Sequence, residues 1–163
     1  RGFRNMSLAD AEAAGRALKA ACAAAAAAGM RVFIHTHGNE FAPVGGTTPL
    51  ERMSEASDSC FDIEADIFWV KWAGEDPAAF IRRYGSRVTS LHLKDIGAAG
   101  LGKPQDKLPP ESFTILGQGS VDWPAVMAAS RAAGVRHYII EDESADPARQ
   151  IPPSIAYLDS IAG

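Results

Sequence analysis

The chain alternates four apolar, strand-like segments with helical segments, and this alternation is the feature that most restricts its fold. The strand-like segments are residues 30–37 (MRVFIHTH), 60–70 (CFDIEADIFWV), 87–95 (RVTSLHLKD) and 136–143 (RHYIIEDE). Regular alternation of this kind is typical of parallel βαβ units, in which helices cover the strands. We therefore predict an α/β fold with a parallel sheet. The hydrophobic content of 47% and charged content of 22% are ordinary for a globular domain.

The helical segments complete the expected order. A capping box and a run of alanines predict a first helix over Ser7–Ala28. The other helices are predicted at residues 49–56, 76–84, 122–134 and 152–162. The stretch from 95 to about 120 is rich in Gly and Pro and is predicted as a long loop, which is usually functional or mobile. No linker divides the chain, so we expect one domain over residues 1–163.

Charge and cysteine content exclude several classes of protein. A net charge of −4 gives no electrostatic footprint for nucleic acid or for an anionic membrane. No apolar run is long enough for a transmembrane helix, and we expect a cytoplasmic protein. Cys22 and Cys60 are predicted to be small buried hydrophobic residues, because their spacing indicates neither a disulfide framework nor a zinc site.

Each strand-like segment ends in a pair of polar residues two positions apart. The pairs are His35/His37, Glu64/Asp66, His92/Lys94 and Glu141/Glu143. Residues two apart on a strand share a face, and the carboxyl edge of a parallel sheet is where α/β proteins bind ligands. Burying four such pairs at one edge is costly unless they neutralise one another or hold a cation.

Two interpretations of these pairs stay open at this point. The side chains can form plain buried ion pairs and hydrogen-bonded core histidines. Alternatively, carboxylates and imidazoles together suit a divalent metal ion such as Mn²⁺, Mg²⁺, Co²⁺ or Zn²⁺. A paired carboxylate with a shifted pKa can also transfer protons.

Several longer stretches resemble the sugar phosphate isomerase/epimerase family, which consists of xylose isomerase-like TIM barrels related in fold to endonuclease IV. These stretches are IHTHGNEF, IEADIFWVKWAGEDPAAFIRRYGSRVTSLHLKD, LGQGSVDWPAV and GVRHYIIEDE. The resemblance runs from about Ser7 to the C-terminus and covers about strands five to eight, the C-terminal half of the barrel. It implies that a missing N-terminal half-barrel or a homodimer closes the structure, and the first residue, Arg1, agrees with an absent N-terminal segment.

The resemblance also implies a divalent metal held by one residue from each of these four strands, commonly Glu, Asp, His and Glu. The matching positions are the strand of His35 and His37, followed by Asp66, His92 and Glu141. Histidine stands where glutamate is usual, which places a symmetric two-base epimerisation in doubt. Glu40 could supply the missing carboxylate as a catalytic residue, or it could be a solvated loop residue.

The remaining site residues are expected around this metal. Glu141 is the best candidate base, and Lys94 could bind a substrate oxyanion or pair with Glu64 or Glu143. Trp69 and Trp72 are expected in a loop after Asp66, either to stack on a sugar ring or to pack as ordinary core. The residues predicted to bind substrate are Trp69, Trp72, Phe41 and Glu143.

The expected function is a metal-dependent isomerase or epimerase of a sugar or keto-sugar, acting by proton abstraction next to a carbonyl. The same chemistry could expel a hydroxyl group, so a keto-sugar or inosose dehydratase, or another lyase, is the nearest alternative. A non-catalytic carbohydrate-binding protein is the alternative from a different class. In each case the expected partner is a small carbohydrate.

Overall fold

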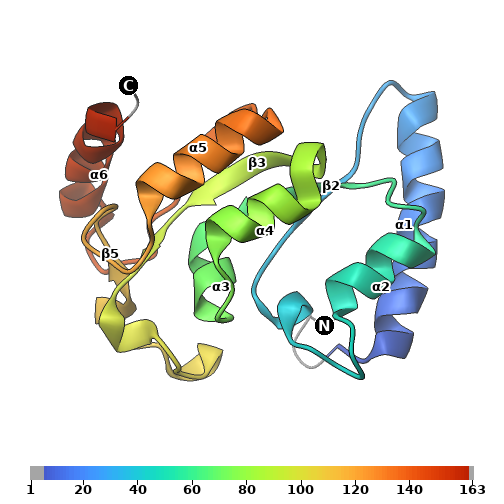
Figure 1. Ribbon diagram of the computed structural model, residues 1–163, viewed down its shortest axis with the longest axis horizontal. Helices are drawn as coiled ribbons and strands as arrows, with labels where there is room; N and C mark the ends of the chain where they lie inside the picture. The colour runs from blue at the N-terminus through green and yellow to red at the C-terminus, as the bar shows by residue number, and fades with distance from the viewer. Residues whose placement is uncertain (1–5, 162–163) are drawn as a thin grey trace. The chain divides into compact units, whose positions relative to one another are not determined.

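The computed structural model describes residues 6–161, which divide into two units at Glu64. The first unit holds α1 (Leu8–Ala27), β1 (Phe33–His35), the 3₁₀ turn η1 (Asn39–Phe41), α2 (Pro49–Ala56) and the start of β2 (Asp62–Asp66). In Figure 1 α1 and α2 lie side by side. Gly15 allows this close approach, because a Cβ atom there would lie 2.6 Å from the carbonyl oxygen of Met53.

The ends of α1 are local consequences of sequence. The Ser7 hydroxyl accepts a hydrogen bond from the backbone N–H of Asp10, and the Asp10 carboxylate accepts one from the backbone N–H of Ser7. This capping box, predicted from the sequence, satisfies N–H groups that the first turn leaves without helical partners. The helix stops before Ala28, and Gly29 follows with a φ of 70°, a conformation that favours glycine.

A disulfide between Cys22 and Cys60 joins α1 to the segment just before β2. The prediction of two buried, unbonded cysteines was therefore wrong, and Cys60 is exposed. The two residues are 38 apart in sequence, and packing brings their Cα atoms to 6.2 Å, within the normal range for a disulfide. An ion pair of 2.6 Å between Lys19 and Asp58 joins the same two segments. Disulfides persist mainly in oxidising compartments, so this bond does not support the predicted cytoplasmic location. That location stays a prediction.

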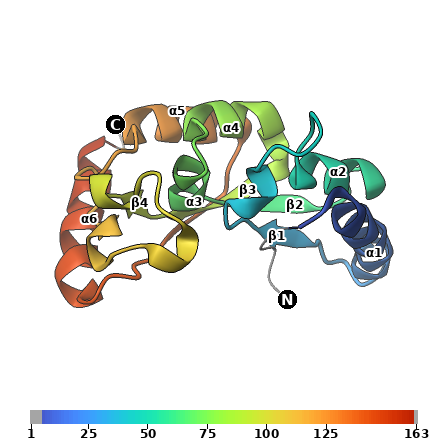
Figure 2. The same cartoon turned by 90° about the horizontal axis from the view of Figure 1, so that it is seen from below.

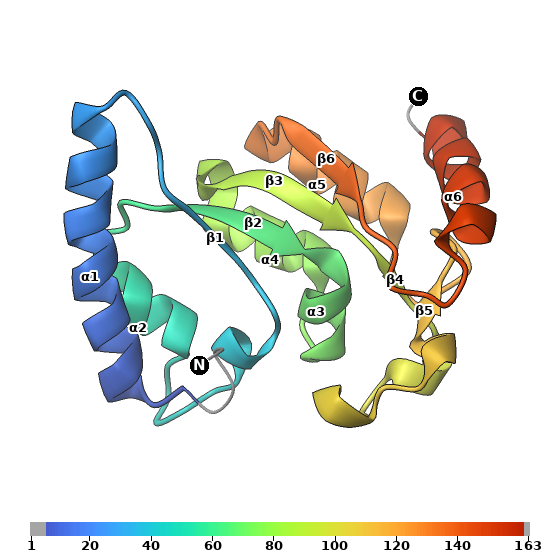
Figure 3. The same cartoon turned by 180° about the vertical axis from the view of Figure 1, so that it is seen from behind.

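The second unit holds the end of β2 and most of the helices. Its remaining elements are α3 (Ile67–Trp72), α4 (Pro77–Tyr84), β3 (Val88–Leu93), β4 (Asp95–Ile96), β5 (Phe113–Thr114), α5 (Trp123–Ala133), β6 (His137–Ile140) and α6 (Pro147–Ile161), with short 3₁₀ turns at 85–87, 98–100, 105–107 and 110–112. Figure 3 shows β3 and β6 side by side, and Figure 2 shows α4 and α5 next to each other.

The main sheet is parallel, as the alternation of elements predicted. β1 pairs with β2 so that His35 lies opposite Glu64, and β3 pairs with β6 so that Leu93 lies opposite Ile140. β2 starts in the first unit and ends in the second, and the hydrogen-bonded order is β1-β2-β3-β6. All four strands are shorter than predicted. β6 ends at Ile140, which leaves the acidic residues after it in a connecting segment.

The predicted strand over residues 60–70 was too long, because residues 67–72 form the helix α3. Asp66 ends β2 and caps this helix, since its carboxylate accepts a hydrogen bond of 3.3 Å from the backbone N–H of Trp69. An apolar run of this kind does not distinguish a buried strand from a buried helix. The consequence is that Trp69 and Trp72 lie on a helix instead of the expected loop.

The predicted loop over 95–120 is organised by Asp95, whose side chain is fully buried. Its carboxylate accepts hydrogen bonds of 2.8–3.2 Å from five N–H groups, which are the backbone of Ile96, Gly117, Gly119 and Val121 and the indole of Trp123. A Cβ atom at Gly119 would collide with this carboxylate. A short antiparallel ladder between β4 and β5 also spans the segment. Much of the expected loop is therefore anchored.

The last helix begins earlier than predicted, at Pro147, because the Asp146 carboxylate accepts a hydrogen bond of 3.2 Å from the backbone N–H of Arg149. Its predicted last residue, Ala162, lies outside the described residues. The strands at the two ends of the sheet order expose large apolar side chains, including Phe33 on β1 and Ile139 on β6. Within residues 6–161, no helix has the length and hydropathy needed to cross a membrane.

Candidate functional site

Three predicted site residues converge in the second unit. Asp66 is the last residue of β2, His92 lies near the end of β3, and Glu141 follows β6. Each offers one ligand atom, and these atoms lie within 4.8 Å of one another. Because parallel strands end at a common edge, three segments far apart in sequence deliver their side chains to one place. The convergence expected from the sequence is confirmed for these three residues.

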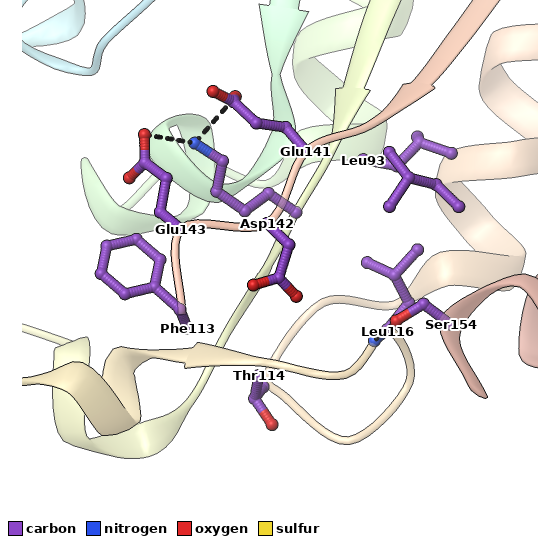
Figure 4. Close-up of a pocket in the computed structure, with 10 residues that line it drawn as sticks. Leu93, Phe113, Thr114, Leu116, Glu141, Asp142, Glu143 and Ser154 are labelled. Atoms are coloured by element: carbon purple, nitrogen blue, oxygen red, sulfur yellow. Dashed lines mark hydrogen bonds and ion pairs between the residues drawn. The ribbon is translucent and has the colours of Figure 1, made fainter. Parts of the chain in front are cut away.

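Lys94 lies among carboxylates beside this cluster, and its side chain is only 3% exposed. The Lys94 Nζ atom is 2.9 Å from Glu141 Oε2, 3.2 Å from Asp66 Oδ2 and 3.3 Å from Glu143 Oε1. Figure 4 shows Glu141 and Glu143 reaching the ammonium group from two sides. The ion pair with Glu143, one of the two roles considered for this lysine, is present.

In this network, Lys94 and Glu141 each stabilise the charged form of the other. Burial alone would lower the pKa of Lys94, but the neighbouring Asp66 carboxylate, followed by Glu141 and Glu143, raises it above its usual 10.5. Burial alone would raise the pKa of Glu141, but hydrogen bonds from Lys94 and His92 lower it below its usual 4.5. The His92 Nδ1 atom lies 2.7 Å from Glu141 Oε2. Glu141 is therefore ionised and Lys94 is charged at neutral pH.

The aromatic residues after Asp66 divide into a buried and a partly exposed one. Trp69 is 5% exposed and packs edge-on against Phe68, with ring centroids 4.8 Å apart. Trp72 is half-buried, and its indole N–H donates a hydrogen bond of 2.7 Å to the carbonyl oxygen of Lys103. Trp69 thus belongs to the core, and Trp72 joins α3 to the segment after β4.

The other predicted residues lie in the first unit. His35 Nδ1 is 3.1 Å from Glu64 Oε1, and the His35 ring meets that of the exposed His37 edge-on, with centroids 4.5 Å apart. Glu40 is fully buried, so the alternative of a solvated loop residue was wrong. Both of its oxygens accept hydrogen bonds from the His37 backbone N–H, at 3.0 and 3.2 Å. Phe41 is 5% exposed.

The environment of Glu40 opposes its ionisation. Burial raises its pKa above 4.5, although the backbone hydrogen bonds and the nearby His35 act in the opposite direction. A carboxyl group whose pKa is raised towards neutrality is suited to proton transfer. This property agrees with the catalytic role predicted for Glu40 and does not test it.

A small pocket adjoins the Lys94 network and is lined in part by Glu141, Asp142 and Glu143. Figure 4 shows that the Asp142 carboxylate points towards Thr114, whereas those of Glu141 and Glu143 point towards Lys94. Sequence reasoning missed Asp142 and Thr114. The unbroken acidic run at 141–143 was the available signal for Asp142, but Thr114 comes from β5, which was predicted as loop.

The chain has relatives among known proteins. The family described as xylose isomerase-like TIM barrel matches residues 5–161. An inosose dehydratase from Clostridium beijerinckii is 27% identical over 128 residues, which are 74% of this chain and 42% of that protein. The chain spans about half the length of the curated relatives it matches.

Solved structures share the fold. A sugar phosphate isomerase/epimerase from Parabacteroides distasonis superimposes with a TM-score of 0.76 at 22% identity, over 94% of this chain and 53% of that one. An IolI protein with a bound zinc atom superimposes with a TM-score of 0.70 at 13% identity, over 97% of this chain and 59% of that one. These likenesses identify the architecture around the three converging side chains.

Proposed function

Because the chain belongs to the xylose isomerase-like TIM barrel family, we propose that it contributes the metal site of an enzyme that acts on a ketone of a sugar or polyol. The reaction begins with removal of a proton from the carbon next to the carbonyl. The observation that carries this proposal is the convergence of Asp66, His92 and Glu141 within 4.8 Å at one edge of the sheet.

The donor set fits a divalent metal ion. Two carboxylates and one imidazole are ligands for Zn²⁺, Mn²⁺ or Co²⁺, and Mg²⁺ favours the oxygens. We propose His35 as the donor from β1, because it pairs with Glu64, two residues before Asp66 on the same strand. Bound there, the ion would polarise the carbonyl and a neighbouring hydroxyl of the substrate and so acidify the C–H bond between them.

The side chains supply the proton transfers. Glu141 is ionised and accepts the proton from the substrate carbon. Lys94 offers positive charge beside it for the oxygen on which negative charge develops. Glu40, with its raised pKa, is the proposed second proton-transfer group. Returning the proton to the same or a neighbouring carbon completes an isomerisation or epimerisation.

Dehydration is a second candidate, favoured by the similarity to inosose dehydratases. It shares the first step with isomerisation. The hydroxyl on the carbon beyond the deprotonated one then leaves as water, after it receives a proton from an acid such as Glu40. The two reactions differ in what happens after C–H cleavage, so one experiment separates them.

We would incubate the protein with Mn²⁺ or Zn²⁺ and with inosose or a ketohexose in deuterated water, and analyse the products by mass spectrometry. Deuterium in an unchanged or isomeric ketone supports isomerisation, and loss of one water supports dehydration. His92→Ala should abolish either reaction. His137→Ala, which removes an exposed imidazole from β6, should leave it unchanged. Carbohydrate binding without exchange or water loss would contradict an enzyme and support a binding protein.

A separate comparison of variants identifies which residue of the first unit is a metal ligand. Titration calorimetry with Mn²⁺ or Zn²⁺ on His35→Ala, His37→Ala and Glu40→Gln should show the largest loss of affinity for His35→Ala. A larger loss for Glu40→Gln would instead assign the fourth ligand to the buried carboxylate. If all three variants bind the metal as tightly as wild type, this segment provides no metal ligand.

A further inference from the structure

Glu143, two residues after the proposed ligand Glu141, has no role in the metal site described so far. We propose that Glu143 is the counter-ion of Lys94 and makes this lysine compatible with a divalent cation bound by Asp66 and Glu141. Glu143 would thus be a positioning residue that acts through Lys94, instead of the substrate ligand predicted from the sequence. This inference rests on the proposed metal site and names a residue that regulates its affinity.

The geometry sets up a competition for the same carboxylates. The Lys94 Nζ atom lies 2.9 Å from Glu141 Oε2 and 3.2 Å from Asp66 Oδ2, and both residues are proposed metal ligands. Lys94 is 3% exposed, so water cannot solvate its charge in their place. An ammonium group this close to two ligands repels any divalent cation that shares them. A third carboxylate must therefore hold the lysine if both cations are to be accommodated.

Glu143 meets this requirement. Its Oε1 atom is 3.3 Å from Lys94 Nζ, and Figure 4 shows it approaching the ammonium group from a different direction than Glu141. Three carboxylates around one ammonium leave an excess of two negative charges, which one divalent cation balances. Without Glu143 the same lysine and metal would share only Asp66 and Glu141, with a net positive charge.

Glu143 is the carboxylate around Lys94 that can be substituted with little effect on packing, because its side chain is exposed. Its side chain is 44% exposed, compared with 0% for Asp66. Removing Glu143 therefore leaves no large cavity and no newly buried charge except that of Lys94. The expected effect is electrostatic, and groups that support metal ligands from outside typically change metal affinity by about 10- to 100-fold.

The test is the affinity for Mn²⁺ or Zn²⁺, measured by titration calorimetry and therefore independent of activity. Glu143→Gln should bind the metal about 10-fold or more weakly than wild type. Asp142→Asn is the matched control, because it removes the same charge from the neighbouring residue, for which no contact with Lys94 is found. Its affinity should fall by less. Glu143→Asp, which keeps the charge on a shorter side chain, should recover part of the affinity.

A double-mutant cycle tests whether Glu143 acts through Lys94. In a Lys94→Met background, the further change Glu143→Gln should alter metal affinity by less than about 2-fold, since no ammonium remains to be held. An equal loss in both backgrounds would overturn the proposal and indicate a direct effect on the metal. If Lys94→Met does not fold, the comparison of Glu143→Gln with Asp142→Asn decides, and equal losses refute the proposal.

Failure of the two proposals can be told apart. If wild type binds neither metal, the proposed metal site is wrong and this inference falls with it. If wild type binds a metal that His92→Ala loses, but Glu143→Gln binds it as tightly as wild type, the metal site stands and only the role of Glu143 is refuted.

Discussion

Asp95→Asn should be among the most damaging single substitutions in the second unit. The Asp95 carboxylate accepts two hydrogen bonds at Oδ1, from Ile96 and Val121, and three at Oδ2, from Gly117, Gly119 and Trp123. Asparagine keeps only one acceptor oxygen. In its better orientation, its NH₂ group would face the N–H groups of Ile96 and Val121, so that two donors lose their acceptor and meet a third donor.

The magnitude follows from those two donors. Ile96 is fully buried and Val121 is 9% exposed, so neither N–H group can turn readily to bulk water. An unsatisfied buried donor costs about 1–3 kcal/mol, so the expected loss in the free energy of unfolding is about 2–6 kcal/mol. Loss of charge weakens the remaining three bonds further.

Asp122→Asn provides the matched control, because Asp122 lies between Val121 and Trp123, two of the residues that donate to Asp95. Asp122 caps α5 by accepting a hydrogen bond of 3.0 Å from the backbone N–H of Ala125, and asparagine caps helices equally well. Its stability should stay within about 0.5 kcal/mol of wild type. Urea unfolding followed by circular dichroism compares the two variants. If Asp95→Asn loses no more than Asp122→Asn, the carboxylate does not organise this segment as described.

Three further predictions concern the first unit and assembly. Cys60→Ser should lower the free energy of unfolding by about 2–4 kcal/mol, and a reducing agent should destabilise wild type but not the variant; equal effects on both would contradict the disulfide. The raised pKa of Glu40 means that the folded state binds its proton more tightly than the unfolded state, so ionisation costs stability as pH rises through 4.5. Glu40→Gln should therefore gain stability relative to wild type as the pH rises above 4.5 in urea titrations, and a constant difference would contradict this sign. The isolated chain should be a dimer or poorly stable, because its terminal strands expose Phe33 and Ile139; light scattering that shows a monomer, with an unfolding midpoint independent of concentration, would refute this expectation.

The order of elements could be predicted from sequence because each strand and helix carries a local signal. Alternating apolar and helical segments gave the parallel sheet, and the capping pair at Ser7 and Asp10 marked the start of α1. Strand-end pairs predicted a site edge, since the carboxyl ends of parallel strands meet in space. Asp66, His92 and Glu141 do meet there.

What sequence could not provide depends on contacts between distant residues. The disulfide joins Cys22 and Cys60 across 38 residues, and no local spacing indicates it. Asp95 takes most of its hydrogen bonds from residues 117–123, so the order in the long segment became apparent only when both parts were placed. The helix α3 was missed for a different reason, because its apolar residues suit a buried strand equally well.

The central claim is that Asp66, His92 and Glu141 together bind a divalent metal ion. Anomalous diffraction from crystals of the chain grown with Mn²⁺ or Zn²⁺ tests it most directly. We expect a single strong peak within about 2.0–2.5 Å of donor atoms from all three residues, and its loss in crystals of His92→Ala. A peak at another position, or an unchanged peak in that variant, would contradict the account.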